Sequence, residues 1–288
     1  MGSRLPGASR FSSPDPLFGE VAPEIIEAAL IHLAVANEHL LSALPGPAGC
    51  REARAVEFIF LLSEKWHLDH PARYQAVELL ERFMIKQIEQ IRTSPRENIP
   101  SSGQGRRRNP LQEQICDTFV LRLVSCIQLA SKLSLHYNAV NSDTALKFLQ
   151  SLKYSYTKQE LLESELTVLQ TLQFQINVLT PLAYIELLLE VLGKSIIKRE
   201  WRGIMCVPLL DFLYLKRDTI YDTLLNIAIE NLTPSELQIA KFLIVKEDLM
   251  LLAVGIISTS AFMLNPEHWK KVQSLPSKRA LHGGEKWR

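Results

Sequence analysis

The residues best suited to chemistry in this chain are its seven histidines, its four cysteines and a few closely spaced carboxylates. Histidines and cysteines hold metals when they pair at short spacings, but the histidines here are scattered and no CxxC motif occurs. Glu163 and Glu165 are two positions apart, so a helix would point them to different sides and they would not form an acid–base pair. Glycine-rich phosphate loops and the HExxH and GxSxG motifs are also missing. We therefore expect no catalytic residue, no metal site and no cofactor, and the chain is not predicted to be an enzyme.

A second candidate is a basic segment, residues 92–110, which carries five arginines and one glutamate. Its 19 residues are many for a connection inside a compact domain. Three of the arginines are consecutive: Arg106, Arg107 and Arg108. Such a run can serve nuclear import or contact phosphate groups, although it is more often simply a solvated loop. We keep these three arginines as a possible basic patch.

The composition narrows the class of protein that must position these residues. The 288 residues include 47 leucines but only 12 glycines, which favours helices over the many tight turns of a β-rich fold. Hydrophobic residues make up 47% and charged residues 22%, as in an ordinary globular protein. The net charge of +1 argues against a general nucleic-acid coat. Direct binding of DNA is therefore not expected.

Apolar residues recur at helical spacing along most of the chain, and no stretch alternates for long enough to predict a strand. The expected helices cover residues 23–40, 52–66, 71–91, 111–132, 144–152, 158–172, 181–192, 209–215, 220–229 and 249–264, with one more after 233–234. Thr157 and Glu160 have the spacing of a capping box at the start of one helix. The pattern predicts an all-α protein of two bundles of about five helices each, joined near Asn177.

The most apolar run, residues 249–264, raises the question of a membrane segment. It has 16 uncharged residues, which is short of the roughly 18 to 20 that span a bilayer, so we expect a buried core helix. Residues 1–19 are rich in Ser, Pro and Gly and lack the apolar core of a signal peptide. We expect this segment to be disordered, the tail at 266–288 to be flexible, and the protein to make no membrane contact.

Three stretches resemble helices of cyclin boxes, and they occur in the cyclin order. LLSEKWHLDHPARYQAVELLERFM (61–84) resembles the first two helices, and LVSCIQLASKLS (123–134) resembles the third. YTKQELLESELTVLQTLQFQINVLTPLAYIELLL (156–189) resembles the fifth helix, the link and the first helix of the second box. The cyclin A-V-x-x-[IL]-[DE]-R-F run is formed here by Ala76, Val77, Leu80, Glu81, Arg82 and Phe83.

The resemblance implies two tandem cyclin boxes, each a five-helix bundle. The N-terminal helix and the first box would cover residues 20–178, with an arginine-rich insertion at 92–110. A second, divergent box would cover 179–265, so that only the two ends of the chain lie outside the boxes.

Cyclins hold their kinase through a lysine on the third box helix and a glutamate on the fifth. The matching positions are Lys132 and Glu165, which the resemblance implies are contacts for a kinase partner. Charged groups on rigid helices can fix the orientation of a partner helix through charge-assisted hydrogen bonds. We expect both side chains to be exposed. Without the resemblance, they would be interpreted as two solvated charges on amphipathic helices.

One cyclin feature is replaced in this chain. Cyclins that recruit substrates carry a run with Met, Arg, Leu and Trp on the first helix. At the matching place the chain has Arg51, Glu52, Ala55 and Phe58. The resemblance therefore does not support a groove for docking substrates.

Within the cyclins, the match is closest to a group associated with crossover maturation in meiotic recombination. This implies a non-catalytic regulatory protein that promotes crossover formation by binding a cyclin-dependent kinase or by acting as a helical adaptor. Expected partners are that kinase, recombination-associated proteins and ubiquitin-ligase components, and the expected location is the nucleus, on meiotic chromosomes, with the cytoplasm as a second site. Two alternatives stay open: a scaffold that works without a kinase, and a cell-cycle or transcription-type cyclin that activates one.

Overall fold

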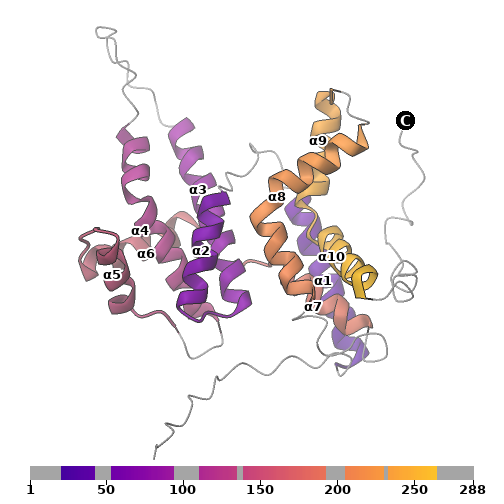
Figure 1. Ribbon diagram of the computed structural model, residues 1–288, viewed down its shortest axis with the longest axis horizontal. Coiled ribbons are helices and arrows are strands. Elements are labelled where there is room, and N and C mark those ends of the chain that lie inside the picture. The colour runs from indigo at the N-terminus through magenta and orange to yellow at the C-terminus, as the bar shows by residue number, and fades with distance from the viewer. Residues whose placement is uncertain are drawn as a thin grey trace, which may run out of the picture.

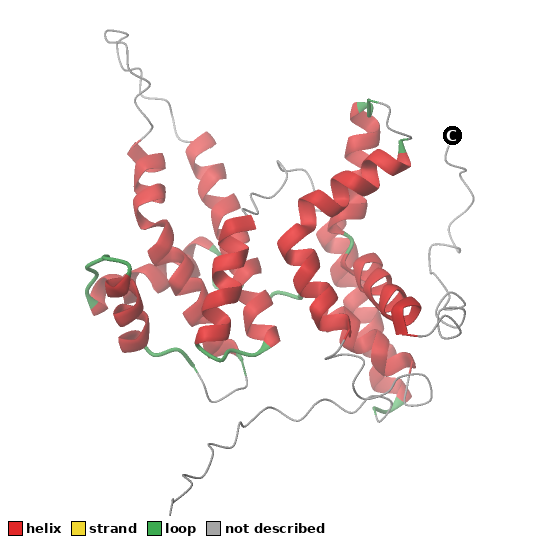
Figure 2. Ribbon diagram, in the orientation of Figure 1, coloured by secondary structure: helices red, strands yellow, loops and turns green. Residues whose placement is uncertain are grey.

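The computed structural model describes residues 21–42, 53–93, 110–134, 139–192, 205–229 and 233–264. Every regular element in these ranges is a helix, and they contain no strand (Figure 2). The expectation of an all-α protein is therefore confirmed. The helices form two groups that lie side by side (Figure 1).

The first bundle contains five helices from consecutive parts of the chain. They are α2 (Ala53–Lys65), α3 (His70–Thr93), α4 (Pro110–Leu133), α5 (Ser142–Ser151) and α6 (Lys158–Thr171). Its fully buried side chains include Ile59, Leu79, Leu123, Ile127, Leu149 and Leu161. They come from all five helices, so each helix of this bundle contributes to its hydrophobic core.

The second bundle takes four helices from the C-terminal half and one from the N-terminus. The four are α7 (Pro181–Leu192), α8 (Val207–Ala228), α9 (Glu236–Glu247) and α10 (Leu249–Leu264). The fifth is α1 (Pro23–Ser42), which contacts α7, α9 and α10. The sequence grouped this helix with the first box, whereas its contacts lie with the second bundle; the predicted domain limits themselves stay predictions.

Buried polar side chains attach α1 to the second bundle. The Asn37 amide donates to Asp248 Oδ1 at 3.0 Å and accepts from the backbone N–H of Leu249 at 3.0 Å. The Tyr184 hydroxyl donates to the Leu33 carbonyl at 3.1 Å. Because buried polar groups are costly without partners, these bonds fix where α1 sits on α7 and on the start of α10.

Local sequence signals explain several helix starts. Proline opens α1, α4 and α7, as expected for a residue whose missing N–H is not needed in the first turn. Thr157 and Glu160 form the predicted capping box of α6, because the Thr157 N–H donates to the Glu160 carboxylate at 2.7 Å and Thr157 Oγ1 accepts from the Glu160 N–H at 3.2 Å. The capping-box prediction is confirmed.

The C-terminal helices differ from the expectation in two respects. The predicted helices at 209–215 and 220–229 are two helical segments that join directly as α8, with a kink at Lys216 where φ is −122° and ψ is 19°. The apolar run 249–264 forms α10, but only one side of it is buried, including Ala253, Ile256 and Ile257, while Phe262 is 61% exposed. Among the described helices, α1 alone is long and apolar enough to cross a membrane, which is weak evidence by itself.

The two bundles meet where α8 packs against α2, and paired tyrosines join α8 to α3. The rings of Tyr74 and Tyr214 stack with centroids 4.9 Å apart. The Tyr74 hydroxyl donates to Asp211 at 2.8 Å, and the Tyr214 hydroxyl donates to Glu78 at 2.8 Å. Each tyrosine thus bonds a carboxylate on the opposite helix, which fixes the register of α3 against α8.

Candidate partner-binding face

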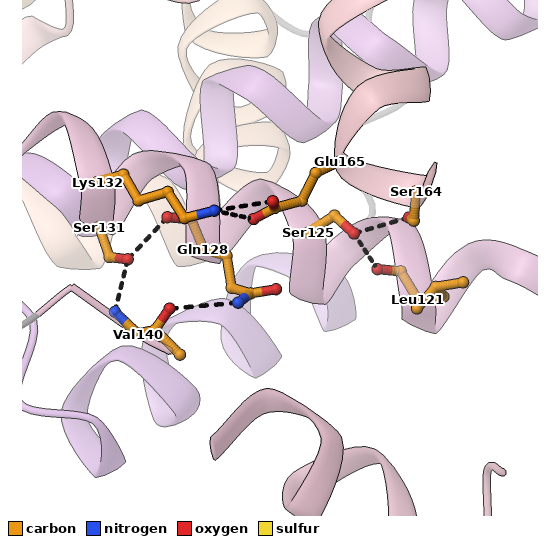
Figure 3. A network of polar contacts seen from close by, with 8 residues as sticks. All are labelled: Leu121, Ser125, Gln128, Ser131, Lys132, Val140, Ser164 and Glu165. Atoms are coloured by element: carbon orange, nitrogen blue, oxygen red, sulfur yellow. Dashed lines mark hydrogen bonds and ion pairs between the residues drawn. The ribbon is translucent and has the colours of Figure 1, made fainter. Parts of the chain in front are cut away.

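The candidate partner-binding face contains Lys132 and Glu165, and it lies on the last turns of α4 and the middle of α6. The two helices pack closely, and the hydroxyls of Ser125 and Ser164 lie 2.7 Å apart at their buried contact (Figure 3). Lys132 lies seven residues after Ser125, about two turns further along α4, and Glu165 directly follows Ser164 on α6. The core contact therefore sets the distance between these two side chains.

Lys132 and Glu165 form a two-pronged ion pair. Lys132 Nζ lies 2.6 Å from Oε1 and 2.8 Å from Oε2 of Glu165 (Figure 3). The Lys132 side chain is 45% exposed, whereas that of Glu165 is only 9% exposed. The expectation that both side chains are exposed is therefore wrong for Glu165, which the lysine covers. A carboxylate at this depth requires such a partner, because burying an unpaired charge is costly.

The end of α4 is held by bonds to the segment that follows it. The Ser131 hydroxyl donates to the Gln128 carbonyl at 2.7 Å and accepts from the Val140 N–H at 3.0 Å. The Gln128 amide donates to the Val140 carbonyl at 3.2 Å (Figure 3). Lys132 therefore projects from a turn whose neighbours are fixed, and its position is set before any partner arrives.

The two helices that carry the ion pair also carry exposed apolar side chains. Leu162 and Leu166 are 42% and 45% exposed and share one side of α6, because they are four positions apart. Leu133 follows Lys132 and is 42% exposed. The surface thus combines a fixed charge with exposed apolar area, which is the usual composition of a protein-binding surface. The sequence reasoning named only the two charges and missed these leucines.

Phe174, three residues after the end of α6 at Thr171, has an aromatic side chain that is 63% exposed. It and Gln173 have positive φ values of 59° and 52°, a backbone conformation that is costly for residues other than glycine. Side chains of α3 hold the segment that follows: Arg82 Nη1 donates to the Gln175 carbonyl at 2.7 Å, and the Gln75 amide donates to the Ile176 carbonyl. Phe174 therefore lies in a strained turn, and hydrogen bonds from α3 hold the backbone that follows it.

Arg82, part of the cyclin-like run, thus has a structural role. Burial lowers the pKa of Arg82, and the nearby Glu78 carboxylate opposes this shift. Its neighbour Phe83 is only 2% exposed and lies in the core of the first bundle.

Other candidate residues lie elsewhere. In the described part of the chain, no group of three His, Cys, Asp or Glu side chains could hold a metal ion. Glu163 bonds Gln159 at 2.9 Å on the exposed side of α6, while Glu165 turns toward α4. Arg106, Arg107 and Arg108 lie outside the described residues, as do Arg51 and Glu52.

The two described positions of the replaced substrate-docking run are inside α2. Ala55 is buried, and Phe58 packs against Phe148 with ring centroids 5.9 Å apart.

Comparison with known proteins identifies one family and two relatives. The family described as "Cyclin, N-terminal domain" matches residues 35–177. The chain is 52% identical to "Cyclin N-terminal domain-containing protein 1" of mouse over 259 residues, which cover 88% of this chain and 78% of the relative. The human protein of the same name is 52% identical over 262 residues, with the same coverage. No solved structure matches the chain significantly.

Proposed function

The chain belongs to the cyclin family, and on that basis we propose that it is a non-catalytic regulator that promotes crossover formation and maturation in meiotic recombination. It does so by binding a cyclin-dependent kinase through the face around Lys132 and Glu165. The kind of partner follows from the cyclin family, and the meiotic role follows from the resemblance to a group of cyclins associated with crossover maturation. The proposed location is the nucleus, on meiotic chromosomes.

The proposed kinase contact is supported by the ion pair between Lys132 and Glu165 and by the exposed apolar side chains of α4, α6 and Phe174. The Lys132 ammonium has three N–H donors, and Glu165 takes two of them. The third donor has no hydrogen-bond partner among the described residues, and it would bond a backbone carbonyl of the kinase. Leu133, Leu166 and Phe174 would then supply apolar contact area, each gaining by leaving water.

A second candidate is a helical adaptor that works without a kinase and joins recombination or ubiquitin-ligase factors. The replaced substrate-docking run favours it, since Ala55 is buried and Phe58 packs on Phe148 inside the first bundle. This candidate uses the same fold but does not require the face around Lys132.

A pull-down of the intact protein from germ cells, followed by mass spectrometry, separates the two candidates. Recovery of a cyclin-dependent kinase near one per chain supports the first, and its absence with recovery of ubiquitin-ligase or recombination proteins supports the second. Phe174→Ser should reduce kinase recovery at least about tenfold, as for loss of an interface hot spot. Leu237→Ser, at a residue 66% exposed on α9, is the matched control and should leave recovery unchanged. Equal recovery with both variants would rule out this face.

A further inference from the structure

Four positions in the sequence place a serine or threonine directly before proline, the minimal signal read by proline-directed kinases. They are Ser13-Pro14, Ser94-Pro95, Thr180-Pro181 and Thr233-Pro234. The first two lie outside the described residues, so the structure distinguishes only between Thr180 and Thr233.

Thr180 is closed to a kinase in the folded protein. It is 7% exposed, and its carbonyl accepts from the Ala183 N–H at 3.0 Å in the first turn of α7. A kinase needs the acceptor hydroxyl and its neighbours in an extended, accessible strand of peptide. Reaching Thr180 would require local unfolding at the start of α7.

Thr233 has the opposite surroundings. Thr233 is exposed, and residues 233–235 are not part of any helix. The proline after it favours an extended backbone at Thr233. The Thr233 hydroxyl makes no hydrogen bond within the described parts of the chain, so nothing there has to be broken before it reacts.

The neighbouring hydroxyl, Ser235, is already in use. Ser235 Oγ accepts from the Gln238 N–H at 3.3 Å, and the Ser235 N–H donates to Gln238 Oε1 at 2.9 Å. This capping box fixes the start of α9 and leaves Thr233 two residues outside it. Modification of Thr233 would therefore not require α9 to unwind.

The start of α9 is also loosely packed, whereas its end is anchored. None of the residues of α9 is buried, but Lys246 pairs with Asp218 at 2.6 Å and Arg217 bonds the Lys246 carbonyl at 2.7 Å. Figure 1 shows α9 and the last turns of α8 at one end of the second bundle. The 233–235 segment, which directly precedes α9, therefore belongs to this end of the second bundle.

We propose that Thr233 is a phosphorylation site for a proline-directed serine/threonine kinase. Thr233 Oγ1 attacks the γ-phosphorus of ATP, the bond between this phosphorus and the β–γ bridging oxygen breaks, ADP leaves, and the hydroxyl proton passes to the kinase. The product carries about −1.5 to −2 charges at neutral pH. These charges lie near Glu236 and the exposed Leu237, so the start of α9 gains negative charge beside an exposed apolar side chain. The site does not depend on the proposed kinase contact, since any proline-directed kinase can serve.

The test uses the full chain and two synthetic peptides, residues 175–186 and 228–239, with a purified proline-directed kinase and Mg·ATP. Both peptides should be phosphorylated, because both contain the Thr-Pro signal in an unfolded form. In the folded chain, Thr233 should be modified at least about ten times faster than Thr180, which is reached only by local opening. Site-resolved mass spectrometry measures both rates.

Variants separate the site from its surroundings. Thr233→Ser should keep the modification, Pro234→Ala should slow it by about tenfold or more, and Thr233→Ala should remove it without changing the far-UV circular dichroism. The proposal is overturned if the 228–239 peptide is modified while Thr233 of the folded chain is not. It is equally overturned if Thr180 and Thr233 react at similar rates in the folded chain.

Discussion

Tyr74 of the first bundle stacks on Tyr214 of the second, with planes only 21° apart, and each hydroxyl bonds a carboxylate of the opposite helix. Both tyrosines are almost fully buried. Phe60 lies against both rings, with centroids 6.1 Å away in each case. The contact between the bundles is thus an aromatic cluster closed by two reciprocal hydrogen bonds.

The first prediction concerns this cluster. Tyr214→Ala should destabilise the fold by about 3–5 kcal/mol, as for other large aromatic side chains removed from a core. Tyr214→Phe keeps the ring and loses the bond to Glu78, so it should cost about 1 kcal/mol. Urea unfolding followed by circular dichroism measures both values. Leu224→Ala, at a residue 47% exposed on the same helix, is the control and should change little. Equal stability of Tyr214→Ala and Leu224→Ala would contradict a central role for the ring.

The sequence predicted the helices well because their apolar periodicity is strong, but it did not predict which helices would pack together. The N-terminal helix shows the limit. Periodicity identifies the side of α1 that is buried, and chain order suggested the first box, yet Asn37 and Asp248 meet 211 positions apart. Neither residue carries a local signal of this pairing. The kink at Lys216 was missed in a similar way, because two apolar segments with a polar interruption predict two helices as readily as one bent helix.

The candidate partner-binding face was likewise predicted only in part from the sequence. Lys132 and Glu165 were identified through the cyclin resemblance, and the structure brings them together. Their different depths could not be predicted, since exposure depends on how far α6 is turned against α4. Phe174 was missed because positive φ at a residue other than glycine has no sequence signature.

The second prediction measures the ion pair by a double-mutant cycle. Lys132→Met leaves the Glu165 carboxylate without its partner in a nearly buried place and should cost about 1–2 kcal/mol, reduced by the water that reaches the half-exposed lysine. Glu165→Gln in the same chain should restore part of this loss, because a neutral amide is cheaper to bury than a charge. Urea midpoints of the four proteins give the coupling energy. Strictly additive effects would mean that the pair contributes nothing to stability.

The third prediction concerns the attachment of α1. Asn37→Leu fills the same space but leaves the Leu249 N–H without its acceptor and should cost about 1–3 kcal/mol. Hydrogen exchange should increase at the start of α10, and α1 should become a better target for protease. Glu38→Leu, at the exposed position next to it, is the control. Unchanged exchange at the start of α10 in Asn37→Leu would show that apolar packing alone holds α1.

The last prediction follows from the buried thiol of Cys126. Burial raises the pKa of this thiol from its usual 9.0 to about 12, and the nearby Arg122 guanidinium opposes the shift. Above pH 9 the unfolded chain loses the thiol proton while the folded chain keeps it. The stability that the neutral thiol contributes is therefore fully present below pH 9 and is lost as the pH rises toward 12, by about 1.4 kcal/mol per pH unit.

The measurement compares urea midpoints of the wild type and Cys126→Ala at pH 8 and pH 10.5. The variant will be less stable at both values because it leaves a small cavity, so the informative quantity is the difference between the two slopes. Ionisation of lysines and tyrosines at high pH affects the stability of both proteins equally, so it cancels in that difference. Stability should fall less steeply with pH in Cys126→Ala. Parallel slopes would mean that the thiol ionises equally well in the folded chain, which its complete burial argues against.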